Sequence, residues 1–328
     1  MTSETTRLAF VGQTTYFAAC ALQGRAGSID ACFIDFREGA SAAALTKRLR
    51  DASPDVVVVF KPEIVPSGLL ADLDATTIGY LTEPLPRAAS EDAHPDLERR
   101  LRNLRSIDAA SFDRIITFDP EVEIPEDLGF TPWRAVPLPV SDRYFKPVRP
   151  SSFSGRAVFI GRSTGHREHV LTPAKHVYDL LHIAHGVGPD ELERVLAETD
   201  VGINVHNEDY SNFENRVSLH LAAGHLLLSE RLRPTFGLEP GLDYIEFDGA
   251  DHLLWLLRRI ESSPDLYRRV RLRGRSKAEL FRASRVYPAL LHDLRHDLET
   301  FGTSRKAARG LEARSADEAS ATRAALAS

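Results

Sequence analysis

Five consecutive apolar residues, Val56 to Phe60, constrain the fold of this chain more than any other segment. A run of four valines and a phenylalanine has no polar side to turn toward water, so it is typical of a strand buried on both faces. Such strands occur in parallel sheets that helices cover on both sides. A helical pattern, with Leu45 and Leu49 four residues apart, comes just before the run. The run therefore predicts an α/β fold.

Shorter strand-like runs alternate with helical patterns along the first half of the chain. They cover residues 7–12, 30–36, 76–84, 113–121 and 133–139. This alternation is typical of a parallel sheet with helices on both faces. The first half is therefore predicted to form one α/β unit of this kind.

A Pro- and Ser-rich stretch at 139–155 is the best candidate for a linker, and a second α/β unit follows it. Strands are expected at 156–162, 201–206, 225–230 and 243–249, and helices at 189–200, from Asn215 to a stop at Gly224, at 250–281 and at 284–301. With 328 residues, two domains are expected. The predicted division is 1–148, 149–285, a closing helix at 286–302 that packs back on the first domain, and a frayed or disordered tail at 303–328.

Composition excludes several classes of protein. A net charge of -6 gives no reason to expect nucleic acid as a partner. Cys20 and Cys32 are predicted to be packed, reduced thiols of a cytoplasmic protein. No apolar segment is long enough to span a bilayer, and the first residues do not have the pattern of a signal peptide. The basic stretch at 268–275 is predicted to be a solvated or salt-bridged helix face, with peripheral membrane contact left open.

The common cofactor and nucleophile motifs are absent from the sequence. No G-x-G-x-x-G follows the first strand, and neither G-x-x-x-x-G-K-[ST] nor G-x-S-x-G occurs. His166 and His169 are three residues apart without further ligands, so they are interpreted as exposed loop residues and no metal site is expected. A dinucleotide site, a P-loop and a hydrolase triad are therefore all disfavoured.

Ligands of parallel α/β sheets bind beyond the carboxyl ends of the strands. A single polar residue there is often only a solvated loop residue, and that reading stays open for each one. As a set, they could line one crevice between two domains. The candidates are Gly12, Gln13, Lys61, Glu63, Thr82, Glu83 and Asp119 in the first half, and Gly161, Arg162, His206, Ser229 and Glu230 in the second.

The second half suggests phosphate chemistry. Arg162 and Arg167 are expected in a loop after a strand, and the arginine fork matches phosphate oxygens. The helix starting near Asn215 presents free backbone N–H groups and a partial positive charge. Gly224 is expected to end that helix in the left-handed conformation. A diphosphate held between these groups would need no metal.

The order of several motifs resembles GT-B glycosyltransferases of the group-1 type, which include spore-maturation (CgeB-like) proteins. The matching pieces, from residue 55 to 294, are DVVVVFKPE, GYLTEP, FDRIITFDPE, VPLPVSDRYFKP, VFIGR, DVGINVH, ENRVSLHLAAGHLLLSE, FGLEPGLDYIEFD and SRVYPALLHDL. The resemblance implies two Rossmann-like domains with parallel sheets that face each other across a cleft. It implies transfer of a sugar from a UDP-, GDP- or TDP-sugar to the hydroxyl of a small-molecule, glycan or lipid-linked acceptor, with no cofactor.

The resemblance also assigns roles to residues. The donor side would consist of Gly161, Arg162, Arg167, Asn215, Arg216, Ser218, Gly224 and Glu230, with the loop of Phe236, Glu239, Pro240 and Gly241 closing the nucleotide pocket. The acceptor side would consist of Gly12, Gln13 and Lys61, and the candidates for catalytic groups are Glu83, Asp119, His206 and Glu214.

One position departs from the resemblance. Many such enzymes have a ribose-binding glutamate five residues before the glycine that ends the helix, and this chain has Leu219 there. A leucine accepts no hydrogen bond from ribose hydroxyls. Two alternatives therefore stay open: a binding or scaffold protein with a decayed donor site, and a nucleotide-sugar 2-epimerase.

Overall fold

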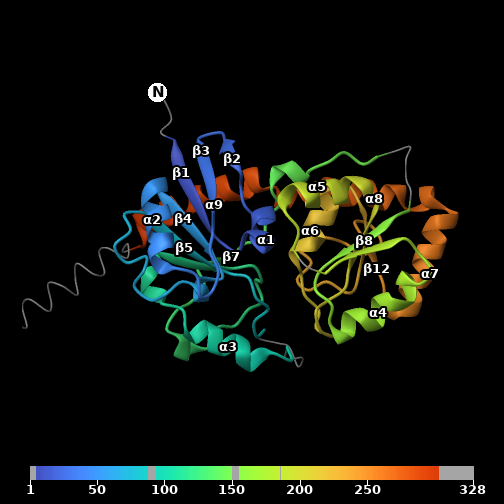
Figure 1. Ribbon diagram of the computed structural model, residues 1–328, viewed down its shortest axis with the longest axis horizontal. Helices are drawn as coiled ribbons and strands as arrows, with labels where there is room; N and C mark the ends of the chain where they lie inside the picture. The colour runs from blue at the N-terminus through green and yellow to red at the C-terminus, as the bar shows by residue number, and fades with distance from the viewer. Residues whose placement is uncertain (1–4, 88–93, 150–154, 185, 303–328) are drawn as a thin grey trace, which may run out of the picture.

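Two sheets lie side by side along the long axis of the molecule (Figure 1). The structure is a computed structural model, and it describes residues 5–87, 94–149, 155–184 and 186–302. We call the part built on each sheet the first and the second domain. The residue boundaries predicted for them stay a prediction, and the predicted tail at 303–328 lies outside the described residues.

The first sheet has seven strands in the order β2-β3-β1-β4-β5-β6-β7. They are β1 (Thr6–Gly12), β2 (Gly24–Ala26), β3 (Ile29–Asp35), β4 (Val56–Phe60), β5 (Thr76–Leu81), β6 (Arg114–Thr117) and β7 (Arg134–Ala135). The run of valines is β4, fully buried between β1 and β5, as predicted. The sheet is parallel except for β2, an edge strand antiparallel to β3 that the sequence patterns did not indicate.

Helices cover both faces of the first sheet. They are α1 (Thr14–Phe17), α2 (Ala42–Ala52), α3 (Leu97–Arg105) and, from the end of the chain, α9 (Ala283–Thr300). Leu45 and Leu49 of α2 pack on one face, while Tyr287 and Leu290 of α9 belong to the core on the other face. The closing helix therefore lies against the first domain, where Figure 1 shows it in orange-red.

The second sheet is wholly parallel, with the order β12-β11-β10-β8-β9. Its strands are β8 (Ala157–Ile160), β9 (Leu180–Ile183), β10 (Val201–Asn204), β11 (Leu226–Ser229) and β12 (Ile245–Glu246). Strand β9 was not predicted. It is an edge strand that is only half-buried, so its sequence has a weak apolar signal.

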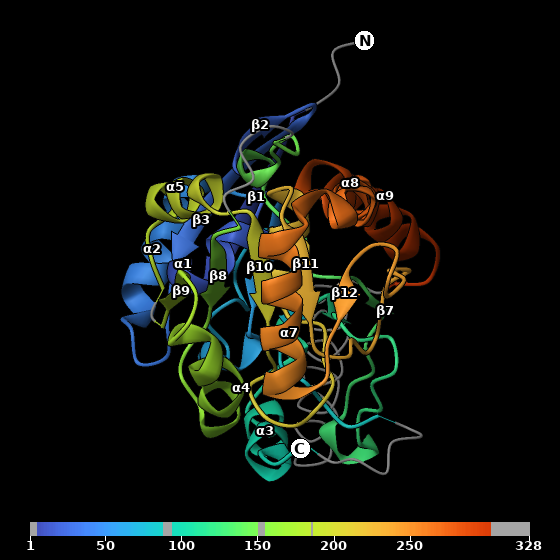
Figure 2. The same ribbon diagram turned by 90° about the vertical axis from the view of Figure 1, so that its right-hand side faces the viewer.

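The helices of the second domain are α4 (Gly165–Lys175), α5 (Pro189–Glu198), α6 (Asn215–Ala222), α7 (Gly249–Ser262) and α8 (Arg268–Lys277). Figure 2 shows α7 in front of the sheet, where Leu253, Leu256 and Leu257 enter the core as helical spacing suggests. Helix α4 corrects the prediction of a loop there: the Thr164 side chain caps its first turn, so Arg167, His166 and His169 lie on a helix.

Three smaller expectations are also changed. The helical pattern at 250–281 is two α-helices, because the chain turns between Ser262 and Arg268. Leu266, expected on an apolar helix side, is exposed, and so is Cys32, whereas Cys20 is buried. The basic stretch of α8 is salt-bridged as predicted, through pairs such as Arg271 with Asp200. No helix among the described residues is long and apolar enough to cross a bilayer.

Two buried histidines pack behind the second sheet. The His220 ring fills the space over Gly202, where a Cβ would lie only 2.3 Å from it. His220 Nδ1 lies 3.1 Å from His225 Nδ1, and His225 Nε2 donates to the carbonyl of Leu196 at 2.9 Å. Burial lowers the pKa of His225 to about 4. Burial, together with the neighbouring His225, holds the pKa of His220 well below its ordinary value. Both rings are therefore neutral at pH 7.

These histidines are expected to make the protein less stable in acid. Their folded pKa values lie below the ordinary value of 6.5, so the unfolded state binds more protons as pH falls from 6.5 toward 4. Each ring then removes ~1.4 kcal/mol of stability per pH unit. Urea unfolding between pH 5 and 7.5 should show this slope, and it should flatten in His220→Phe. The exposed His169→Gln is the control, and an equal slope in both variants contradicts the assignment.

Candidate functional site

Three loops meet at the carboxyl edge of the second sheet: residues 161–164 after β8, 205–214 after β10, and the segment after β11 that begins at Glu230. The side chain of Thr164 donates to the carbonyl of Asn207 at 2.8 Å. Glu230 accepts from the backbone N–H of His206 at 2.6 Å. We call Arg162, Arg167, Arg216 and Glu214, which lie among these loops, the arginine cluster.

Arg167 points into the protein and is only 3% exposed. An arginine has five N–H donors, and here all of them have acceptors. They are the carbonyls of Val205, His206 and Arg162, Asn207 Oδ1, and both carboxylate oxygens of Glu214. Burial and the neighbouring Arg216 lower the pKa of Arg167 to about 10, so it stays charged. Arg167 was expected to bind diphosphate directly, and in this arrangement it has no donor left for a ligand.

Arg216 is held in the same way. Its guanidinium donates to the carbonyls of Ile160 and Val205, to Asn204 Oδ1 and to Glu214. Both buried guanidinium groups also lie over the ring of Phe159, with centroid distances of 5.3 Å for Arg167 and 5.1 Å for Arg216. Arg167 and Arg216 therefore act at the carboxyl edge of the sheet through their electrostatic field and not through hydrogen bonds to a ligand.

Gly161 makes room for these two arginines. A Cβ at this position would lie 3.0 Å from Arg216 Nη2 and 3.3 Å from Arg167 Nη1. At 3.0 Å, the guanidinium of Arg216 would have to shift by a few tenths of an ångström. The glycine that the resemblance places in the donor site therefore lets the arginine cluster pack without this shift.

Glu214 lies between the two buried arginines. It contacts Arg167 Nη2 at 3.1 Å and forms a short ion pair with Arg216. Burial opposes its charge, but Arg216 and Arg167 outweigh burial and hold the pKa of this carboxyl far below its ordinary value of 4.5. A carboxylate with so low a pKa is a poor general base. The catalytic role suggested for Glu214 stays a prediction from sequence, and its surroundings favour a role as the counter-charge of the two arginines.

Arg162 is the exposed member of the cluster. Its Nε donates to Asn207 Oδ1 at 3.1 Å, and no acceptor among the described residues takes its two terminal nitrogens. Glu214 forms ion pairs with Arg167 and Arg216, whereas Arg162 has no carboxylate partner among the described residues. The unpaired guanidinium and the free donors therefore coincide at Arg162.

His206 and Glu230 join the loops rather than face solvent. His206 is 4% exposed, and its Nε2 donates to the carbonyl of Arg231 at 2.8 Å. Its buried Nδ1 has no hydrogen-bond partner and lies 3.9 Å from Glu214 Oε1. Glu230 Oε1 contacts His166 Nε2 at 2.8 Å. His206 is thus too enclosed to reach an acceptor hydroxyl in this arrangement.

Helix α6 begins at Asn215 as predicted. Ser218 is fully buried in it and donates to the carbonyl of Asn215 at 3.0 Å. Gly224 has the predicted left-handed φ of 76° and lies just beyond the other end of the helix, against Pro147 and Val148. The donor-site role of these two residues stays a prediction from sequence, and in the structure both shape the helix and its packing.

The start of α6 touches the first domain. The Asn215 side chain donates to the carbonyl of Tyr16 in α1 at 3.4 Å. Gln13 caps the same helix α1, and Gly12 is buried at the end of β1, where a Cβ would lie 3.1 Å from Phe60. The structure thus brings Gln13, predicted on the acceptor side, to the same region as Asn215, predicted on the donor side.

A second charged cluster lies at the carboxyl edge of the first sheet. Lys61, in a left-handed conformation with φ 59°, contacts Glu83 Oε1 at 2.7 Å, and Arg100 contacts Glu83 Oε2 at 2.6 Å. Burial opposes the charge of Glu83, but Lys61 and Arg100 outweigh it and keep the pKa of this carboxyl below its ordinary value. Two cationic partners make Glu83 a weak base, against the suggestion from sequence.

Asp119 is fully buried and pairs with Arg87 at 2.7 Å. A carboxylate with no exposed surface and a bound guanidinium does not meet an acceptor hydroxyl. The catalytic role suggested for Asp119 stays a prediction from sequence, which its burial and its ion pair with Arg87 do not favour. Arg87 itself was not singled out from sequence, because nothing in its local pattern shows that it reaches a buried partner 32 residues away.

Glu63 differs from Glu83 and Glu214 because its pKa is raised and theirs are lowered. Its side chain is 10% exposed, and Lys61 Nζ lies 3.8 Å away. Burial raises the pKa of Glu63 above its ordinary value, and the ammonium of Lys61 only partly offsets this. In the sequence, its position just after β4 was the feature that indicated Glu63 as a candidate site residue.

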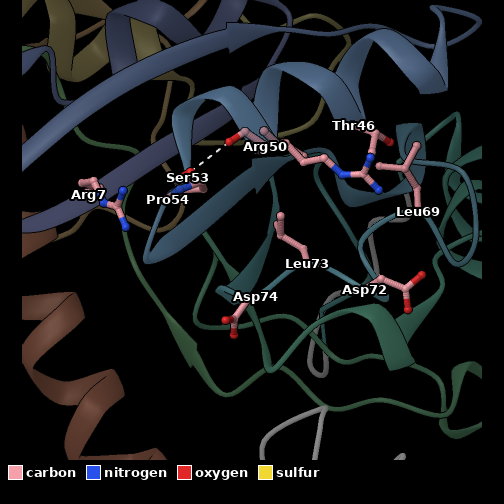
Figure 3. A pocket seen from close by; sticks show the side chains of 10 residues that line it. Arg7, Thr46, Arg50, Ser53, Pro54, Leu69, Asp72, Leu73 and Asp74 are labelled. Atoms are coloured by element: carbon pink, nitrogen blue, oxygen red, sulfur yellow. Dashed lines mark hydrogen bonds between the residues drawn. The ribbon is translucent and has the colours of Figure 1, made fainter.

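A pocket of about 530 Å³ opens at the opposite end of the first sheet. Figure 3 shows Thr46 and Arg50 of α2 on one side and Asp72, Leu73 and Asp74 on the other. None of the residues predicted for the site lines it. Among the residues that the structure describes, no group of three or more His, Cys, Asp and Glu side chains is placed to hold a metal ion.

No family model and no curated protein matches this sequence. Solved structures do match. The chain is similar to HepE of Anabaena, solved with UDP-glucose, with 10% identity over 88% of this chain and 99% of that one and a TM-score of 0.56. It is also similar to the sucrose-phosphate synthase of Thermosynechococcus elongatus, with 12% identity over 89% and 98% of the two chains and a TM-score of 0.52.

A glycosyltransferase from Rickettsia africae has 10% identity over 91% of this chain and 100% of that chain, with a TM-score of 0.50. Identities this low show a shared fold, not a shared reaction. The match covers nearly the whole of this chain, with its two α/β domains, and nearly the whole of each of these glycosyltransferase structures. The chain therefore has the GT-B fold.

Proposed function

We propose that this protein is a glycosyltransferase that moves a sugar from a nucleotide-diphosphate sugar to an acceptor hydroxyl. The observation that carries the proposal is the arginine cluster: Arg162, with free terminal donors and no carboxylate partner among the described residues, lies on the carboxyl edge of the second sheet. Ligands of open α/β sheets bind at that edge. HepE, which shares the fold, was solved with UDP and with UDP-glucose, and this supports a nucleotide sugar as donor.

In the proposed reaction, the diphosphate leaves as the sugar becomes cationic. Stabilising the growing charge on the leaving group is the main task of the protein. Arg162 would donate to the phosphate oxygens, and the buried Arg167 and Arg216 would add a fixed positive field. The N-terminus of α6, which follows Glu214, would add the partial positive charge of its free backbone N–H groups. The reaction proposed in this way uses arginines where other transferases use a metal.

The base on the acceptor side is proposed to be Glu63. A general base works best when its pKa lies near the working pH, and burial moves Glu63 in that direction. The neighbouring Lys61 would orient the acceptor together with Gly12 and Gln13. The peripheral membrane contact, the lipid-linked acceptor and the spore-maturation type remain expectations from sequence.

A second candidate is a binding protein without transfer activity, and Leu219 favours it. This residue is 6% exposed and belongs to the core of the second domain, so it offers nothing to a ribose. The saturated donors of Arg167 point the same way. If the protein has no transfer activity, the arginine cluster only holds the three loops in shape.

Calorimetric titration with UDP, GDP and TDP tests the donor site. One of the three is expected to bind with a Kd below about 1 mM, that is, with at least about 4 kcal/mol of binding free energy. Absence of binding by all three contradicts the donor site and favours the scaffold. Turnover with an acceptor then indicates a transferase, whereas epimerised product or free nucleotide without an acceptor indicates the 2-epimerase.

A further inference from the structure

Arg87, in the loop after β5, connects the two domains. Its side chain is only 2% exposed. Nε donates to Asp119 Oδ2 at 2.7 Å, Nη1 to the carbonyl of Ser211 at 2.9 Å, and Nη2 to the carbonyl of Arg233 at 2.7 Å. One guanidinium of the first domain thus holds two backbone carbonyls of the second. We call these four residues the Arg87 bridge.

The two carbonyls belong to loops that build the arginine cluster. Ser211 lies in the loop 205–214, which carries Asn207 and Glu214, the partners of Arg162 and Arg167. Arg233 follows Glu230 in the segment after β11. A shift of the loop 205–214 would therefore move Asn207, the acceptor on which the position of the Arg162 guanidinium depends. The segment after β11 is tied to that loop through Glu230, which accepts from the backbone N–H of His206.

The surroundings of Arg87 fix its direction. Asp119 neutralises the guanidinium and is itself held, since Asp119 Oδ1 accepts from the N–H of Glu121 at 2.9 Å. The ring of Tyr210, from the second domain, lies 4.9 Å from the guanidinium carbon. The fork of an arginine reaches three acceptors in different directions, whereas a lysine has a single nitrogen.

We propose that Arg87 is a positioning residue, which holds both donor-side loops in register with the first domain so that the donor site takes its binding geometry only in this orientation of the domains. The effect on nucleotide binding rests on the proposed function, but the effect on the loops does not. Asp119 acts as the counter-charge of Arg87 and not as a base.

The main test is the double variant Arg87→Met with Asp119→Leu. Replacing a buried ion pair by apolar residues of similar size is often neutral for stability, so this variant is expected to fold. It lacks the donors to both carbonyls. Amide hydrogen exchange in residues 205–214 and 230–236 is expected to be at least about tenfold faster than in the wild type, because local opening becomes easier.

Arg233→Gln is the matched control. It removes the outer interdomain ion pair with Glu121, whose side chains are 37% and 39% exposed, but it keeps the carbonyl that Arg87 binds. Its exchange is expected to equal that of the wild type. Arg87→Lys keeps the charge without the fork, and its exchange is expected to be nearly as fast as in the double variant.

Nucleotide affinity gives an independent readout. In the double variant, the Kd for the nucleotide that the wild type binds is expected to rise at least about tenfold, with a larger effect on KM than on kcat. Wild-type exchange rates in both loops together with unchanged affinity would overturn the positioning role. If the wild type binds no nucleotide, the proposed function is contradicted. The hydrogen-exchange experiment still tests whether the Arg87 bridge holds the two loops.

Discussion

Replacing Glu214 with glutamine is expected to lower the free energy of unfolding by about 3–5 kcal/mol at pH 7. The physical reason is the loss of the carboxylate that pairs with both buried guanidinium groups. Arg167 and Arg216 lie 3% and 6% exposed, and both donate to Glu214. A glutamine keeps the shape and one acceptor oxygen, but it leaves two like charges facing each other without compensation.

Urea unfolding of Glu214→Gln and of the control Asp209→Asn measures this effect. Asp209 is exposed in the same loop, and its neutralisation is expected to change stability by less than ~0.5 kcal/mol. Equal stability of Glu214→Gln and the wild type would show that the two arginines do not need this carboxylate. If that variant instead lost turnover at unchanged stability, Glu214 would be a catalytic group after all.

The same pair of proteins has a defined pH dependence. The folded pKa of Glu214 lies below its ordinary value of 4.5, so its contribution to stability is complete above that pH and is lost as pH falls below it. The difference between the wild type and Glu214→Gln is therefore expected to be constant from pH 5 to 8 and to shrink in stronger acid. A group whose folded pKa is raised would show the opposite pH dependence, because its contribution to stability is lost as pH rises.

Replacing Arg162 with methionine is expected to lower kcat/KM of the proposed transfer by ~10²–10³-fold, or roughly 3 kcal/mol of transition-state stabilisation. Arg162 is the arginine of the cluster with free terminal donors, so it is the one that would meet the leaving diphosphate. Because it is exposed, the change in folding stability is expected to stay within about 0.5 kcal/mol.

Steady-state rates and urea unfolding of three variants test this assignment. Arg162→Lys keeps the charge but not the fork and is expected to fall between the wild type and Arg162→Met. Arg258→Met removes an exposed arginine of α7 and is expected to leave both rate and stability unchanged. Full activity of Arg162→Met would contradict the assignment of Arg162 to the diphosphate site.

Much of the fold could be predicted because burial leaves a local trace. The apolar run of β4 and the glycine that ends α6 both have the structure expected of them. Strand β9 and helix α4 could not be predicted in this way. The first is half-buried at an edge, and the second begins with polar residues whose helical role depends on the Thr164 cap.

The sequence by itself determined the order of the elements and the residues that follow each strand, because strand and helix patterns are local. The sequence could not show which of Arg162, Arg167 and Arg216 has donors free for a ligand, because all three carry the same charge and the same donors. Only the tertiary structure decided that two of them turn inward. The reason is that their partners come from the ends of β8 and β10 and from the start of α6, and these segments meet only when the sheet is assembled.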